Sequence, residues 1–198
     1  MSRFVSVVVV LLLVASALCF ALVPVVVPDS SDVVRDTVTL AGAQGVPGAW
    51  LARTGFVLLG AAVLAEAARD GDAWGPAGRA AHAVFGAATV SMAVFSASPG
   101  RGGASDAVEA SLHTWAATVA VAAFVVGVLA VRIRRGTRPG PVGVLDVAAL
   151  AAAVVLALAA ETMPAGAGVT ERLLLTVGLV WYTVEAVRQT RIGAAEPS

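Results

Sequence analysis

The chain has 198 residues, of which 59% are hydrophobic and only 13% are charged, and its formal net charge is zero. An ordinary soluble domain carries about 25% charged residues, so this composition excludes a soluble globule as well as a disordered chain. It predicts an integral membrane protein and, without a basic surplus, no nucleic-acid partner. The single cysteine, Cys19, excludes an internal disulfide and a cysteine-based metal centre.

Apolar stretches of about 20 residues, the length that a helix needs to cross the hydrocarbon of a bilayer, recur along the chain. In chain order the six predicted helices cover about residues 4–28, 50–68, 80–98, 110–131, 143–163 and 172–188. Segments rich in glycine and proline separate them, and none is long enough to divide two domains. We therefore predict one all-α transmembrane domain over residues 1–198.

The first predicted helix follows Ser2 and Arg3, as the apolar core of a signal peptide would. Its apolar run exceeds the usual core of about 7–15 residues, and no convincing small-x-small cleavage site follows it. We expect this helix to be retained. Cys19 is then a small buried residue rather than a lipid anchor.

The arginines predict the orientation, because cytoplasmic segments of membrane proteins are enriched in basic residues. With a cytoplasmic N-terminus, most of the 13 basic residues are cytoplasmic, including the cluster at Arg132–Arg138. Both termini then lie in the cytoplasm, which requires an even number of spans. Trp50, Trp115, Trp181 and Tyr182 fall towards predicted helix ends, as aromatic residues of a membrane interface do. The expected localisation is the cell membrane, as a multi-pass protein.

Ionisable residues within predicted spans are candidates for function. They lie towards the helix ends rather than at mid-depth, which favours interfacial pairing and argues against a proton or ion path. We group the polar residues into two layers. The outer layer comprises Arg53, Ser96, Ser98, Glu109, His113, Glu161 and Arg172, and the inner layer comprises Glu66, Arg79, His82, Asp146 and Glu185.

The outer layer is the better candidate for a site. Glu109 and His113 are four residues apart and share one helix face. A carboxylate beside a histidine can orient the ring and raise its basicity, and Ser96 and Ser98 end the preceding helix. The plainer interpretation, which we favour, is a network of salt bridges that ties helix ends together.

Two outer arginines are candidates for ligand binding. Arg53 and Arg172 are suited to hold an anionic group such as a lipid phosphate, or to pair with Glu161. In the inner layer, we expect His82 to form an ordinary hydrogen bond at the membrane interface. The two histidines lie in different layers, so we predict no metal site, and no motif points to a cofactor.

Three stretches carry a resemblance to a known family: Gly48–Gly60, Phe95–Gly100 followed by Leu112–Ala116, and Gly168–Leu174. They resemble six-helix membrane proteins of bacteria and archaea catalogued as domain of unknown function 998. The resemblance runs from about Val34 to Arg188 and implies the fold rather than an activity.

Relatives of this type often carry Phe-Pro-x-Asp at the end of the third helix, followed by a histidine in the fourth. This chain keeps Phe95 and His113 but has Ser96 and Ser98 where the proline and the aspartate would stand. If that aspartate holds a metal or a proton in relatives, the resemblance does not extend that role to this chain.

Three functional hypotheses follow. The first is a non-enzymatic protein that binds membrane lipid or a protein partner as a sensor, scaffold or transport accessory; the sequence specifies neither that partner nor the oligomeric state. The alternative is an intramembrane hydrolase or lipid-modifying enzyme with His113 as base, Glu109 orienting it, and Ser98 or water as nucleophile. The third is a small-solute carrier, which requires a cavity that reaches the middle of the bilayer.

Overall fold

The computed structural model describes residues 2–28, 32–69, 73–99, 106–136 and 141–195, apart from the side chains at positions 2, 3, 141, 161 and 190–195. The described residues form helices and no strands, which confirms the prediction of an all-α fold. The long helices are α1 (Ser2–Val26), α3 (Ala49–Ala67), α4 (Gly75–Val94), α5 (Ala107–Arg135), α6 (Pro141–Thr162) and α7 (Ala167–Ala195). Between them lie a one-turn helix, α2 (Val38–Ala41), and a 3-10 turn, η2 (Pro164–Gly166).

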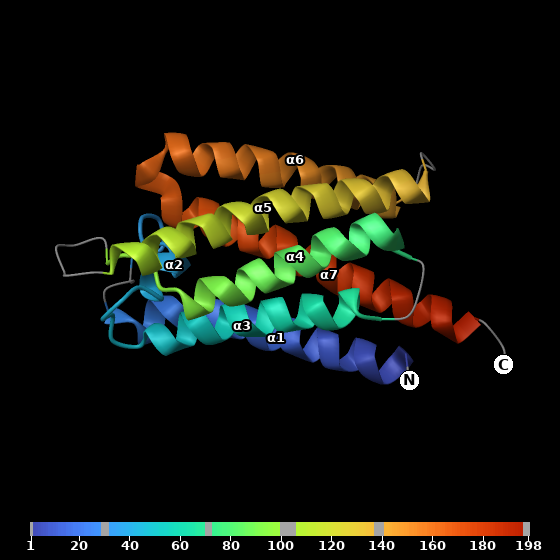
Figure 1. The fold of residues 1–198 in the computed structure, drawn as a ribbon, viewed down its shortest axis with the longest axis horizontal. Helices are drawn as coiled ribbons and strands as arrows, with labels where there is room; N and C mark the ends of the chain where they lie inside the picture. Colours follow the sequence, from blue (N-terminus) through green and yellow to red (C-terminus); the bar gives the residue numbers. More distant parts are fainter. Residues whose placement is uncertain (1, 29–31, 70–72, 100–105, 137–140, 196–198) are drawn as a thin grey trace.

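The long helices run alternately up and down in a single bundle (Figure 1). Each packs on the next in the order α1, α3, α4, α5, α6 and α7, and α7 also packs on α1, so the helices form a closed ring. The start of α1 and the end of α7 lie at one end of the bundle, which we name the terminal end (Figure 1). The opposite end holds α2 and the starts of α3, α5 and α7, and we name it the α2 end.

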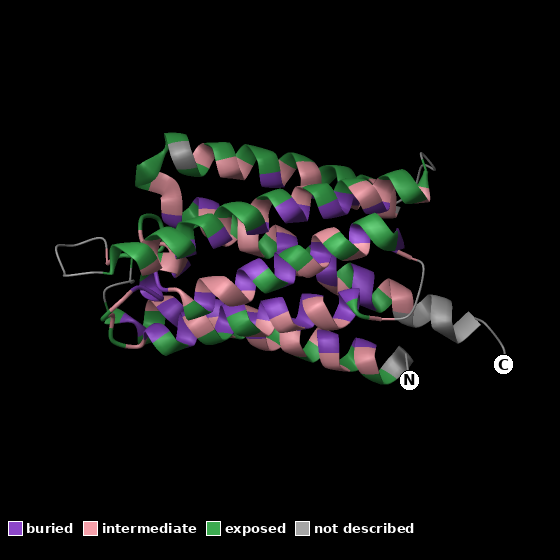
Figure 2. Ribbon diagram, in the orientation of Figure 1, coloured by how far each residue is buried: buried purple, intermediate pink, exposed green. Residues whose placement is uncertain are grey.

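Among the described side chains of α1, those that face outward are apolar, and the polar Ser6 and Ser16 are buried. Leu11, Leu18 and Val25 recur every seven residues and are 62%, 58% and 81% exposed. By contrast, Ser16 is buried and its hydroxyl donates a hydrogen bond to the carbonyl of Gly55 on α3 at 2.8 Å. This arrangement is typical of a helix surrounded by hydrocarbon, because exposed apolar stripes of this length are rare on soluble monomers. Figure 2 shows exposed residues along the outward faces of the other helices as well.

By length and composition, four helical segments among the described residues are able to cross a membrane: Phe4–Val26, Ala49–Ala67, Ala107–Arg135 and Val142–Ala160. The expected number is six. Helices α4 and α7 fall outside this set, and both carry polar side chains that are buried in the bundle. These are His82 and Thr89 on α4 and Glu185 on α7.

The bounds of α4 differ from the predicted 80–98. The helix begins at Gly75, where a positive φ of 63° turns the chain, and Pro76 lies in its first turn. Proline is tolerated there because the first N–H groups of a helix have no intrahelical partner. The helix ends at Val94 because the backbone is extended at Phe95.

Helices α5 and α7 extend beyond their predicted bounds at both ends. Helix α5 covers Ala107–Arg135 rather than the predicted 110–131. The side chain of Asp106 caps its start, and Gly136, with a φ of 73°, ends it. Instead of 172–188, α7 covers Ala167–Ala195. The charged residues of α7 led to a predicted span that is too short. Several of these residues form bonds within the bundle.

Candidate functional site

Glu109 closes the end of the neighbouring helix. Asp106 accepts hydrogen bonds from the amides of Val108 at 2.8 Å and Glu109 at 3.1 Å, which fixes the first turn of α5. The Glu109 carboxylate then accepts the amide N–H of Ser96 at 2.6 Å, just beyond the end of α4. Ser96 is buried, and a buried amide without a partner is costly. Glu109 therefore satisfies a backbone donor at the α2 end of the bundle.

His113 binds the same helix end one turn further along α5. Its Nδ1 lies 3.0 Å from the carbonyl oxygen of Met92 and 2.7 Å from that of Phe95. Because a carbonyl only accepts, we assign the proton to Nδ1, which leaves Nε2 as an acceptor. Nε2 is buried and has no partner among the described residues.

These contacts show how the predicted His/Glu/Ser group is arranged. Glu109, His113 and Ser96 do come together where α4 meets α5, but Glu109 and His113 bond to separate backbone groups rather than to each other. The bonds that the structure gives for the His113 ring go to backbone carbonyls. The arrangement fits a tie between helix ends, and the hydrolase alternative stays a prediction.

The two arginines of the predicted ligand site bind loop carbonyls. Arg53 donates from Nε to the carbonyl of Gly42 at 3.0 Å and from Nη2 to that of Ala43 at 3.3 Å, just after α2. Arg172 donates from Nη1 to the carbonyls of Asp36 at 2.6 Å and Gly168 at 3.1 Å. The side chain of Glu161, the predicted partner of both, lies outside the described residues.

Within the described residues, Arg172 interacts electrostatically with the neighbouring Glu171 but forms no close ion pair. Its Nη2 is buried and has no hydrogen-bond partner within the described ranges. A cation with one unpaired nitrogen is a natural contact for an anionic group.

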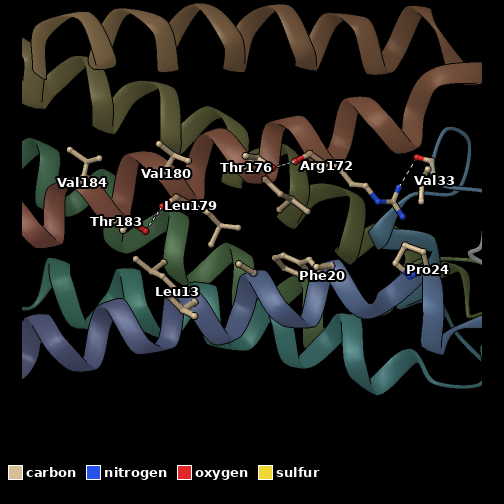
Figure 3. A pocket seen from close by; sticks show the side chains of 14 residues that line it. Leu13, Phe20, Pro24, Val33, Arg172, Thr176, Leu179, Val180, Thr183 and Val184 are labelled. Carbon is tan, nitrogen blue, oxygen red and sulfur yellow. Dashed lines mark hydrogen bonds between the residues drawn. The ribbon is translucent and has the colours of Figure 1, made fainter. Parts of the chain in front are cut away.

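Arg172 lies at one end of a groove of about 600 Å³ between α1 and α7 (Figure 3). Apolar side chains such as Leu13 and Phe20 from α1 and Leu179 from α7 line most of its length. The hydroxyl of Thr183 also lines it, but donates to the carbonyl of Leu179 at 2.7 Å on its own helix. The groove is therefore an apolar trough with a cation at its α2 end, which suits an amphiphile with an anionic head.

A second polar group, at the terminal end, joins α5, α6 and α7. Arg135 donates to Asp146 at 3.2 Å and also forms an ion pair with Glu185. Asp146 and Glu185 are 1% and 0% exposed. Arg188 forms a further ion pair with Glu185 at 3.3 Å. We name these four residues the inner ion network.

Two tryptophans also donate to this network. The indole N–H of Trp181 bonds to Asp146 at 2.9 Å, and that of Trp74 bonds to Glu185 at 3.1 Å. Buried carboxylates are tolerated only when they are paired and hydrogen-bonded, and both conditions are met here. The network therefore holds the terminal ends of four helices together.

The centre of the bundle is aromatic. His82 is fully buried, with its Nδ1 2.8 Å from the hydroxyl of Tyr182 and its ring centroid 4.5 Å and 4.9 Å from those of Trp74 and Trp181. The prediction that Trp181 and Tyr182 lie at a membrane interface is wrong, because their side chains are 0% and 1% exposed. Their polar tips find partners inside the bundle instead.

A family model described as protein of unknown function (DUF998) matches residues 7–188. The chain belongs to this family. The match confirms the predicted resemblance and begins earlier than expected, within α1. Comparison with curated proteins and with solved structures gave no match.

In this DUF998 protein, sequence reasoning placed Asp146, Glu185 and His82 in one layer but did not connect them. The sequence assigns Arg135 a role only in predicting the orientation of the protein in the membrane, and no pattern in it singles out Trp74. The adjacency of α4, α5, α6 and α7 at the terminal end brings these residues together. No group of three or more metal-ligating side chains occurs among the residues that the structure describes.

Proposed function

We propose that this DUF998 protein crosses the cell membrane six times, with both termini in the cytoplasm, and binds an anionic membrane lipid without catalysing a reaction. The observation that carries the proposal is the apolar groove between α1 and α7 with Arg172 at its end, whose Nη2 has no hydrogen-bond partner among the described residues.

The packing of α4 and α7 supports six spans. Helix α4 packs between α3 and α5, and α7 packs between α6 and α1, so a bilayer around those four helices also surrounds these two. Helix α4 has 20 residues, which at 1.5 Å per residue is about 30 Å, the thickness of the hydrocarbon. His82 and Thr89 on α4 and Glu185 on α7 are buried in the interior, where they are not exposed to lipid.

The distribution of arginines supports the orientation. Among the described residues, the terminal end carries Arg69, Arg79, Arg132, Arg134, Arg135 and Arg188, whereas the α2 end carries Arg35, Arg53 and Arg172. Basic residues are enriched on the cytoplasmic side of membrane proteins. The terminal end is then cytoplasmic, and Arg172 faces the outer leaflet.

The groove favours an anionic lipid for an electrostatic reason. Lipid tails around the protein are as apolar as the groove, so contact with an acyl chain alone does not select one lipid over another. A guanidinium distinguishes a phosphate from a neutral headgroup, more strongly at low dielectric than in water. Leu13 and Pro24 line the groove eleven residues apart, about 16 Å along α1, which accommodates a large part of one acyl chain.

The proposal is tested by identifying lipids that co-purify with the full-length protein in mild detergent, using native mass spectrometry. We expect about one anionic phospholipid per protein, enriched over its share of the membrane. Arg172→Gln removes the charge and Ala17→Phe fills the groove from α1, so each is expected to lose this enrichment.

Two matched variants control for general effects. Arg79→Gln removes an arginine at the terminal end, and Val126→Phe adds an aromatic ring to an exposed position on α5. Both are expected to keep the bound lipid. Equal enrichment in the wild type, Arg172→Gln and Ala17→Phe would contradict lipid binding in this groove, and Ala17→Phe decides the matter if Arg172→Gln does not fold.

A further inference from the structure

A second cavity lies inside the bundle, separate from the groove between α1 and α7. It has a volume of about 150 Å³ and is lined by side chains from α3, α4, α5 and α7. Phe56, Phe85 and Phe124 provide aromatic walls, and Thr39 and Glu171 line its α2 end. Phe85 and Phe124 also contact Tyr182 of the central aromatic cluster, so the cavity reaches from the α2 end to the middle of the bundle.

Gly178 on α7 provides independent support for this cavity. The residue is buried, yet a Cβ atom built on it would meet no atom within 4 Å. Other buried glycines of the bundle behave differently: a Cβ on Gly127 would lie 2.5 Å from the ring of His82, and one on Gly60 would lie 2.6 Å from the carbonyl oxygen of Gly86. The absence of a side chain at position 178 therefore leaves space that no described residue fills.

A carboxylate lies at the α2 end of the cavity. Glu171 accepts from the hydroxyl of Thr39 and from its amide, at 3.1 Å to Oε1 and 3.3 Å to Oε2, and the amide of Val38 also donates to it. The salt bridges among the described residues do not include Glu171, although the charge of the neighbouring Arg172, which lines the groove with α1, acts on it.

We infer that this cavity binds a small primary amine, whose protonated nitrogen bonds to Glu171 and whose apolar body lies against the rings of Phe85 and Phe124, which are in contact with each other. A cavity of about 150 Å³ with apolar walls accommodates a molecule of the size of benzene. Aromatic faces attract ammonium groups, and an unpaired carboxylate prefers a cation to a neutral donor. Thr89 lines the cavity and donates its hydroxyl hydrogen to Phe85, so its oxygen can accept a second N–H of the ammonium group.

The test is calorimetric titration of the full-length protein in detergent with benzylamine and, separately, with benzyl alcohol, which has the same shape but no charge at neutral pH. We expect benzylamine to bind once per chain and about tenfold or more tightly than benzyl alcohol, the factor given by a hydrogen bond to a charged group. Glu171→Gln is expected to remove this preference.

Gly178→Leu fills the cavity without a clash at Cβ and is expected to abolish binding of both probes, with Gly178→Ala intermediate. Ala17→Phe, which fills the separate groove, is the matched control and is expected to leave benzylamine binding unchanged. Unchanged affinity for benzylamine in Gly178→Leu overturns the proposal, and so does equal affinity of the wild type for the two probes. If Glu171→Gln does not fold, the two Gly178 variants still test the proposal. If Gly178→Leu keeps the lipid bound in the groove between α1 and α7, the two sites are independent.

Discussion

Replacing Arg135 by methionine tests whether the inner ion network stabilises the bundle. The change keeps a long apolar side chain but removes the cation shared by Asp146 and Glu185. Removal of one partner of a buried ion pair costs about 3–5 kcal/mol, because the other charge is left uncompensated. Glu185 retains Arg188 and Trp74, so we expect a loss near the lower limit, about 3 kcal/mol of unfolding free energy.

A double variant separates charge from packing. Asp146→Asn keeps an acceptor for the indole of Trp181 but removes the negative charge that Arg135 balances. We expect Arg135→Met combined with Asp146→Asn to cost about 1–2 kcal/mol less than the sum of the single changes. Arg132→Met is the matched control, because Arg132 donates to the backbone carbonyl of Gly143 at 2.8 Å, and its loss is expected to cost only about 1 kcal/mol.

The assay is equilibrium unfolding in mixed micelles, in which added SDS unfolds the protein and tryptophan fluorescence reports the transition. Trp74 and Trp181 donate to the network and are buried, whereas Trp50 and Trp115 are exposed, so the fluorescence change arises mainly at the site of the substitution. If Arg135→Met costs no more than Arg132→Met, the network does not stabilise the fold as described.

Three further substitutions test other contacts by the same unfolding assay. Gly127→Ala places a methyl group against the His82 ring and is expected to cost about 1–3 kcal/mol, whereas a neutral effect would show that α4 and α5 are less closely packed. His113→Ala removes the donor that binds the end of α4 and is expected to cost about 1–3 kcal/mol. Ser16→Ala removes the hydroxyl bonded to the Gly55 carbonyl, with an expected cost of about 1 kcal/mol, and no loss would mean that this bond does not join α1 to α3.

The helical architecture could be predicted because apolar runs and glycine- or proline-rich breaks are local features of the sequence. The helix bounds were less accurate where one residue type has two roles. Pro76 suggested a loop but lies in the first turn of α4, and Glu185 and Arg188 suggested the end of a span but pair inside the bundle. Local composition does not show which way such side chains point.

The site was predictable only in part, because its geometry depends on which helices are neighbours. The i, i+4 spacing placed Glu109 and His113 on one face, but their partners are backbone atoms of α4, which no sequence pattern reveals. The groove and the inner ion network require that α7 contacts α1 and that α5, α6 and α7 meet at one end. Spacing along a single helix cannot predict these contacts.

The most direct test of the central claim, six membrane crossings with both termini in the cytoplasm, is cysteine labelling in intact cells. The only native cysteine is replaced by Cys19→Ser, and single cysteines are introduced by Ala77→Cys at the start of α4 and by Ala165→Cys between α6 and α7, both at exposed positions. The account predicts that a membrane-impermeant maleimide labels position 165 in intact cells and position 77 only after the cells are broken. Labelling of both positions in intact cells, or of position 77 alone, would contradict it.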